Sequence, residues 1–145
     1  MTLTIFTIGY EQARIDDVVG ALKAAGVTRL LDVRAVAASR RPGFSKTALA
    51  GALREAGIAY EHLRALGTPK EGREAARRGD MAALKRVYAG QLELPEAQAQ
   101  AAMLMDRAAG EPTALLCYER DAAACHRSLL LASVAPNADV VDLFA

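Results

Sequence analysis

Short apolar segments alternate with amphipathic segments along the first 62 residues, and this alternation restricts the fold more than any other feature. Two stretches carry apolar side chains at helical spacing, residues 14–25 and residues 45–56, and Ser45 is a candidate N-cap of the second. The stretches around them are rich in β-branched and aliphatic residues and predict strands over residues 2–8, 28–33 and 58–62. This order predicts parallel strands joined by right-handed crossovers.

The second half of the chain continues the pattern after an interruption. We expect helices over residues 80–89, 95–110 and 121–134 and strands over residues 113–117 and 139–143. At 145 residues with 52% hydrophobic residues, the chain has enough apolar surface for one core. We therefore predict one α/β domain over residues 1–145, with a mainly parallel sheet of about five strands and helices on both faces. A basic helical insertion would occupy residues 64–94.

Nothing in the sequence predicts export or membrane insertion. No run of about 18 apolar residues occurs, and the N-terminal residues lack the basic and apolar regions of a signal peptide. We expect a cytoplasmic protein without a membrane partner. Cys117 and Cys125 are too few for a disulfide framework, so we expect them to be thiols.

Charge is distributed unevenly along the chain. Residues 34–86 contain 12 Lys and Arg against 5 Asp and Glu, although the whole chain has a formal charge of only +1. Such a basic segment is either an ordinary solvated surface or a patch that binds anions.

Polar and reactive side chains follow four of the predicted strands. Tyr10 follows the first strand, Asp32 and Arg34 the second, His62 the third, and Cys117 ends the fourth. The carboxyl ends of parallel strands line a common crevice, which is where ligands bind in open α/β sheets. We therefore expect one functional site at this edge.

The densest cluster lies between Cys117 and Ser128. Within it, Cys125, near a helix N-terminus and close to Arg127, is a candidate nucleophile or redox thiol, and Glu119 and His126 are candidate acid–base groups. The alternative for both cysteines is burial in the core. No metal site and no cofactor is expected, because metal-ligand spacings are absent and adjacent side chains on a helix point about 100° apart.

A loop before the second helix has the composition of an anion-binding segment. Ser39 and Arg40 offer hydrogen-bond donors and charge, and Phe44 is either a stacking platform for a base or a core residue.

Two further candidates have structural alternatives. Asp32 and Arg34 lie on the same side of a strand, so Asp32 either fixes Arg34 for an anion or braces a loop through an ion pair. His62 is either a general base or a hydrogen-bonded histidine at the strand end.

Several motifs together resemble the domain of unknown function 488 family throughout the chain. They are T-I-G-Y from Thr7, L-D-V-R from Leu31, S-R-R-P-G-F-S-K from Ser39, G-I-A-Y-E-H-L from Gly57, L-G-T-P-K-E from Leu66 and C-Y-E-R-D-x-x-x-C-H-R from Cys117. The resemblance implies an α/β fold with these residues gathered, and it implies no established activity. Some relatives carry labels that connect them with DNA repair.

The residues leave two main functional classes open. The first is an enzyme acting on a phosphorylated or nucleotide-like anion, with Arg34, Arg40, His62 and Arg127 among the binding groups and Asp32, Glu119, Cys125 and His126 as chemical groups. The second is a non-catalytic module that binds nucleic acid or nucleotides through its basic segment. An interaction domain whose motif residues only brace loops is a third class.

Overall fold

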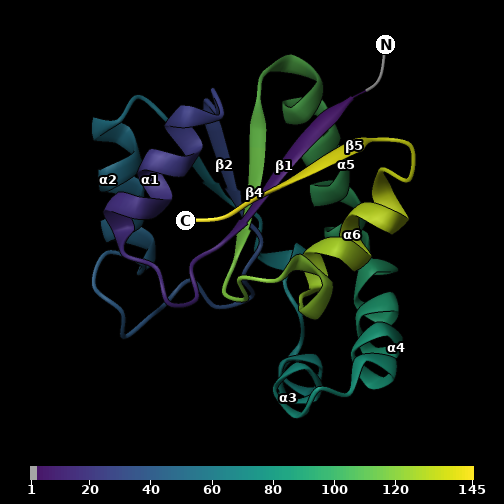
Figure 1. Cartoon of the computed structure of the whole chain (residues 1–145). Coiled ribbons are helices and arrows are strands. Elements are labelled where there is room, and N and C mark those ends of the chain that lie inside the picture. The colour runs from purple at the N-terminus through teal and green to yellow at the C-terminus, as the bar shows by residue number, and fades with distance from the viewer. Residues whose placement is uncertain (1–2) are drawn as a thin grey trace.

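Five strands pair in parallel in the computed structural model, which describes residues 3–145 (Figure 1). The strands are β1 (Thr4–Gly9), β2 (Arg29–Asp32), β3 (Ala59–His62), β4 (Thr113–Cys117) and β5 (Asp139–Leu143), in the order β3-β2-β4-β1-β5. The predicted α/β class is confirmed, and every pairing is parallel. Thr2, placed in the first strand by its sequence, lies outside the described residues.

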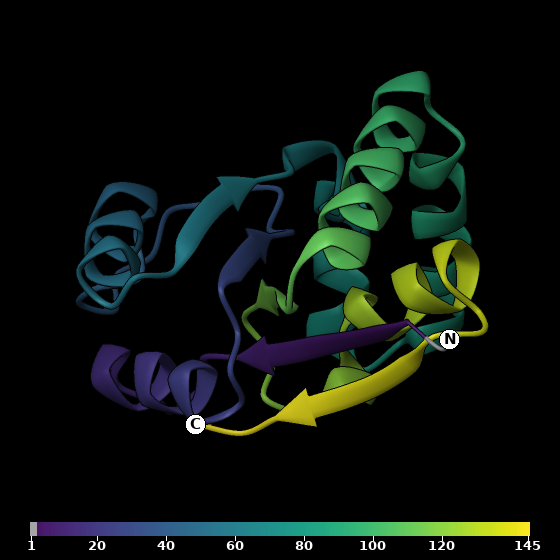
Figure 2. The ribbon, with the colours of Figure 1, turned by 90° about the horizontal axis from the view of Figure 1, so that it is seen from above.

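Helices pack on both faces of the sheet, as predicted (Figure 2). One face is covered by α1 (Ile15–Ala24) and α2 (Lys46–Glu55), and the other by α5 (Pro95–Gly110) and α6 (His126–Val134). Among the described residues, no helix has both the length and the apolar character needed to span a bilayer.

Successive side chains of the central strand β4 point to opposite faces of the sheet and enter two separate cores. Leu115 and Cys117 pack with residues of α5 and α6, whereas Ala114 and Leu116 pack with residues of α1 and α2. All five residues of β4 are buried, which is typical of a strand covered on both faces.

The insertion between β3 and α5 contains one helix more than the sequence predicted. It comprises the 3₁₀ turn η1 (Arg64–Leu66), α3 (Lys70–Arg78) and α4 (Met81–Leu92). The sequence KEGREAARR of α3 contains no large apolar residue, and only Gly72 and Ala75 of this helix are buried.

The predicted continuous helix over residues 121–134 is wrong at its start. A 3₁₀ turn, η2 (Ala122–Ala124), is followed by Cys125 in an extended conformation with φ −131° and ψ 157°, and α6 begins only at His126. Cys125 therefore precedes the helix as its N-cap residue. The side chains of Cys125 and His126 are therefore not separated by the rotation of about 100° that relates successive residues of a helix.

Candidate functional site

A cavity of about 250 Å³ lies beside the carboxyl ends of β1, β2 and β4. Its walls come from the loops after these strands, from the residues before α3 and from α3 and α4. The lining residues are Tyr10, Arg34, Ala35, Val36, Thr68, Arg73, Ala76, Arg77, Leu84, Cys117, Tyr118, Glu119 and His126. The expected crevice is thus present at the expected edge of the sheet.

Two glycines let the loops around this cavity approach one another. A Cβ atom on Gly9 would lie 1.8 Å from the backbone oxygen of Glu119, and one on Gly67 would lie 2.1 Å from the backbone nitrogen of Ala35. Backbone atoms cannot move aside as the tip of a flexible side chain does, so both contacts require glycine. The first brings the end of β1 against the loop after β4, and the second holds the residues before α3 against the loop after β2.

Arg34 is held by four hydrogen bonds to the protein. Its Nε and Nη2 donate to the two carboxylate oxygens of Asp32 at 2.8 and 2.7 Å, and its Nη1 donates to the Tyr10 hydroxyl and the Phe44 carbonyl. Burial opposes the charge, but Asp32 raises the pKa of Arg34 above its usual value. Tyr60 also donates to Asp32 at 2.6 Å. Because a guanidinium has five N–H donors, only one remains for a ligand.

His126 is fixed at the base of the cavity. Its Nε2 lies 2.7 Å from the carbonyl oxygen of Val33, and its Nδ1 lies 3.5 Å from the sulfur of Cys125. Burial lowers the pKa of His126 to about 4, so the ring is neutral at physiological pH. The ring also meets Tyr88 of α4 edge to face, with centroids 5.3 Å apart.

Glu119 lies beside Cys117 in the loop after β4. Its Oε2 is 3.5 Å from the Cys117 sulfur, and burial raises the pKa of its carboxyl group. Arg127 passes behind this loop, where its Nη2 donates to the backbone oxygen of Glu119 at 2.5 Å. Arg127 is fully buried and burial lowers its pKa, so it holds the loop rather than lining the cavity.

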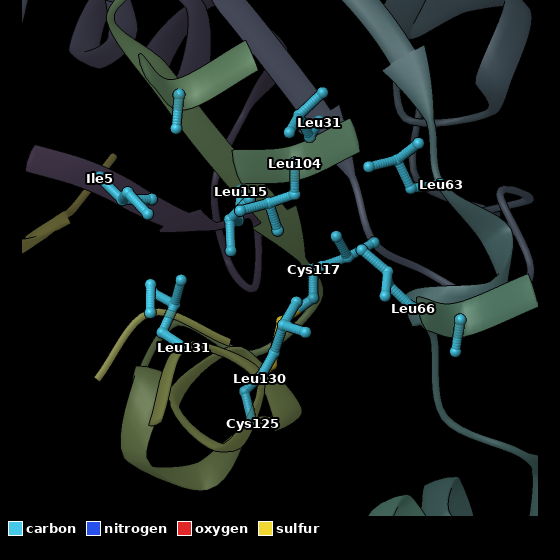
Figure 3. Close-up of a cluster of buried hydrophobic side chains, with 14 of the residues drawn as sticks. Ile5, Leu31, Leu63, Leu66, Leu104, Leu115, Cys117, Cys125, Leu130 and Leu131 are labelled. Atoms are coloured by element: carbon cyan, nitrogen blue, oxygen red, sulfur yellow. A yellow bond between two sulfur atoms is a disulfide. The ribbon is translucent and has the colours of Figure 1, made fainter. Parts of the chain in front are cut away.

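The structure joins Cys117 and Cys125 in a disulfide, whereas the sequence led us to expect two thiols. Figure 3 draws both cysteines with the leucines of the core between the sheet and α5 and α6. Each is only 1% exposed. The number of cysteines indicated thiols, but the loop after β4 returns Cys125 to the end of the strand that carries Cys117.

The predicted site residues divide into two groups. Tyr10, Arg34, Glu119 and His126 line the cavity together with Cys117. The others do not line it: Asp32 lies behind Arg34, Ser39 bonds within its own loop, Arg40 is exposed, the ring of His62 bonds to the Arg34 carbonyl, and Cys125 and Arg127 are buried.

Four polar residues of the cavity were not singled out individually from the sequence. Thr68 and Tyr118 lie within motifs that were recognised, and Arg73 and Arg77 lie one turn apart on α3. Arg73 donates to the carbonyl of Thr68 at 2.8 Å, whereas Arg77 is exposed. Two arginines spaced four residues apart were the available signal for a shared helix face.

Comparison with known proteins identifies the family. The family model described as Domain of unknown function DUF488 matches residues 14–134, which is most of the chain, so the protein belongs to this family. The motif resemblance is thereby confirmed, and the family description assigns no activity. No curated protein and no solved structure gives a significant match to the chain.

Proposed function

We propose that this DUF488 domain is an enzyme that binds a small phosphorylated or nucleotide-like anion in the cavity at the carboxyl edge of the sheet. The observation that carries the proposal is the lining of this cavity. Arg73 and Arg77 on α3 border the same space as Glu119, in the loop after β4, and His126, at the start of α6. Cationic donors and acid–base groups around one concave site are the arrangement that reactions of anions require.

The two arginines of α3 supply the charge. Arg77 is exposed, and its Nε makes only a 3.4 Å contact with the Arg73 carbonyl, so most of its donors are available to an anion. Arg34 lines the cavity but offers an anion only one N–H donor, because Asp32, Tyr10 and Phe44 already accept four hydrogen bonds from it. Guanidinium groups suit this role because they donate two parallel hydrogen bonds to phosphate or carboxylate oxygens.

Glu119 is the residue we assign to proton transfer. Burial raises the pKa of its carboxyl group, which makes Glu119 easier to protonate than a solvated carboxylate. His126 is neutral, and its Nε2 is committed to Val33, so this edge of its ring does not reach a ligand.

Nucleic-acid binding is the less favoured alternative. The aromatic ring expected to stack on a base, Phe44, is 1% exposed and stacks on Tyr10 with centroids 4.4 Å apart. Arg41, a basic residue of the same loop, donates to the Ala13 carbonyl. The loop after β2 therefore lacks the free aromatic face that single-stranded nucleic acid uses.

Calorimetric titration with inorganic phosphate and with adenosine monophosphate tests the proposal. We expect one anion per chain and an affinity reduced about tenfold or more in Arg77→Gln, since a hydrogen bond to a charged group contributes about 1.5–3 kcal/mol. Arg86→Gln is the matched control, because Arg86 is exposed on α4 and does not line the cavity.

Two outcomes would overturn the proposal. One is the absence of binding of either anion in the millimolar range. The other is an equal loss of affinity in Arg77→Gln and Arg86→Gln, accompanied by steeply salt-dependent binding of single-stranded DNA, which would establish a diffuse basic surface instead.

A further inference from the structure

Three potential metal ligands converge at the base of the cavity. One ligand atom from each of Cys117, Cys125 and His126 lies within 4.8 Å of the others, and all three residues are buried. The first ends β4, the second is the N-cap of α6, and the third opens α6. Their convergence depends on the extended conformation of Cys125, which places its sulfur beside the imidazole.

The orientation of His126 determines which ring atom faces the sulfurs. A carbonyl oxygen only accepts hydrogen bonds, so the 2.7 Å contact with Val33 requires a proton on Nε2. In the neutral ring, Nδ1 then has a free lone pair directed toward Cys125, whose sulfur is 3.5 Å away. A disulfide sulfur has no proton to donate, so the oxidised pair leaves this buried lone pair without a donor.

The cysteine backbones are also placed widely for a disulfide. Their Cα atoms are 7.5 Å apart, whereas most disulfides have a separation of about 4.4–6.8 Å. Two thiolates that share one ion do not need the shorter separation.

We propose that the reduced protein binds one divalent ion of the zinc type through Cys117, Cys125 and His126. Reduction comes first: a dithiol reductant transfers two electrons and two protons, the S–S bond breaks, and the reductant becomes a disulfide. Each cysteine thiol then releases its proton to solvent as its sulfur bonds the metal. Two thiolates and one imidazole form a donor set that suits zinc.

The surroundings match those of a metal site. The bond from Nε2 of His126 to Val33 is the outer contact that holds a ligating imidazole in one tautomer and orientation. Cys117 and His126 line the cavity, and three protein ligands leave the fourth position of a tetrahedral ion for water or a ligand. Such an ion supplies Lewis acidity and lowers the pKa of bound water. Glu119, whose Oε2 lies 3.5 Å from the Cys117 sulfur, lines the same cavity.

Cobalt titration of the full-length reduced chain tests the site. The protein is reduced with dithiothreitol, freed of reductant without air, and titrated with Co²⁺, whose bonds to thiolates give an intense near-ultraviolet absorption. We expect one Co²⁺ per chain, displaced by one Zn²⁺, and affinity reduced at least tenfold in Cys117→Ser, Cys125→Ser and His126→Ala. His62→Ala is the matched control, because His62 is the only other histidine and does not line the cavity.

A reduced wild-type chain that shows no thiolate–cobalt absorption would overturn the proposal, and so would full affinity in His126→Ala. If a variant fails to fold by circular dichroism, alkylation of the native reduced wild type decides: Zn²⁺ should slow modification of both thiols, and unchanged rates would reject the site. The metal site is independent of anion binding. A chain that binds Co²⁺ but no phosphate supports the metal site and overturns only the proposed function, and the converse result does the reverse.

Discussion

Gly67 touches the backbone of Ala35 so closely that any side chain there would push the two loops apart. We predict that Gly67→Ala lowers the free energy of unfolding by about 1–3 kcal/mol, the usual cost of overpacking. Urea denaturation measures this change. Gly20→Ala is the control: Gly20 lies within α1 with nothing near the added methyl group, so this variant should gain up to about 1 kcal/mol from helix propensity. Equal effects of both substitutions would show that loop contact is not the cause.

Asp32 neutralises the buried guanidinium of Arg34. Asp32→Asn removes the charge while keeping the shape, and it leaves a 6%-exposed cation without its partner. We predict a loss of about 3–5 kcal/mol in the free energy of unfolding, as is typical when one member of a buried pair is removed. Thermal and urea unfolding provide the measurement. Asp106→Asn is the control. Asp106 pairs with Arg107, and its side chain is 76% exposed, so this variant should leave the free energy of unfolding unchanged within error.

At the scale of residues, the sequence identified the groups that follow the strands and missed those on α3. Tyr10 and Arg34 could be predicted because they follow strands that end at one edge, and His126 because it lies in the reactive segment after β4. Arg73 and Arg77 could not, since nothing in a polar helix indicates which of its faces turns toward a cavity. The sequence predicted that Arg127 binds a ligand, because it lies close to Cys125 and His126. Its long side chain instead donates a hydrogen bond to the Glu119 carbonyl.

Among the elements, α4 determines how the insertion is held against the sheet. Tyr88 is buried, and its hydroxyl donates to the carbonyl of Leu66 at 2.6 Å, which ties α4 to η1. Burial raises the pKa of Tyr88 well above its usual value, so this hydroxyl remains a donor at every physiological pH.

We predict that Tyr88→Phe loosens the insertion while leaving the sheet intact. Loss of one buried hydrogen bond costs about 1 kcal/mol. The cost falls on local opening because α3 packs mainly on α4, which this hydrogen bond ties to η1. Hydrogen exchange should therefore accelerate in α3 and α4 but not in β4. Tyr118→Phe, at an exposed ring, should change neither. Faster exchange in β4 than in α4 would contradict this account.

Elements with a strong apolar period were predicted, and the two errors have physical causes. α3 buries only small residues, so its sequence lacks a stripe of large apolar residues, even though Gly79, with φ +74°, ends the helix in the usual way. At Cys125 the predicted helix contains an extended residue, because η2 ends there and α6 begins afresh. No residue type between 121 and 126 forbids a helix, so tertiary packing decided this break.

At the scale of the whole molecule, one sheet serves two cores. Each central strand contributes alternate side chains to the core under α1 and α2 and to the core under α5 and α6. The cavity lies beyond the ends of these strands, where the loops meet α3. Its geometry therefore depends on both cores, because displacement of β4 would move Cys117 and Glu119 together.

We predict that the two cores unfold as one unit. Leu115 and Leu116 are adjacent in β4 and fully buried on opposite faces. Leu115→Ala and Leu116→Ala should each lower the free energy of unfolding by about 2–5 kcal/mol. Under conditions where amides exchange only through global unfolding, each variant should accelerate the most protected amides of α1 and of α5 to the same extent, since both helices lose the same sheet. If Leu115→Ala acted on α5 alone and Leu116→Ala on α1 alone, the cores would be separate folding units, and substitutions under α1 would leave the cavity undisturbed.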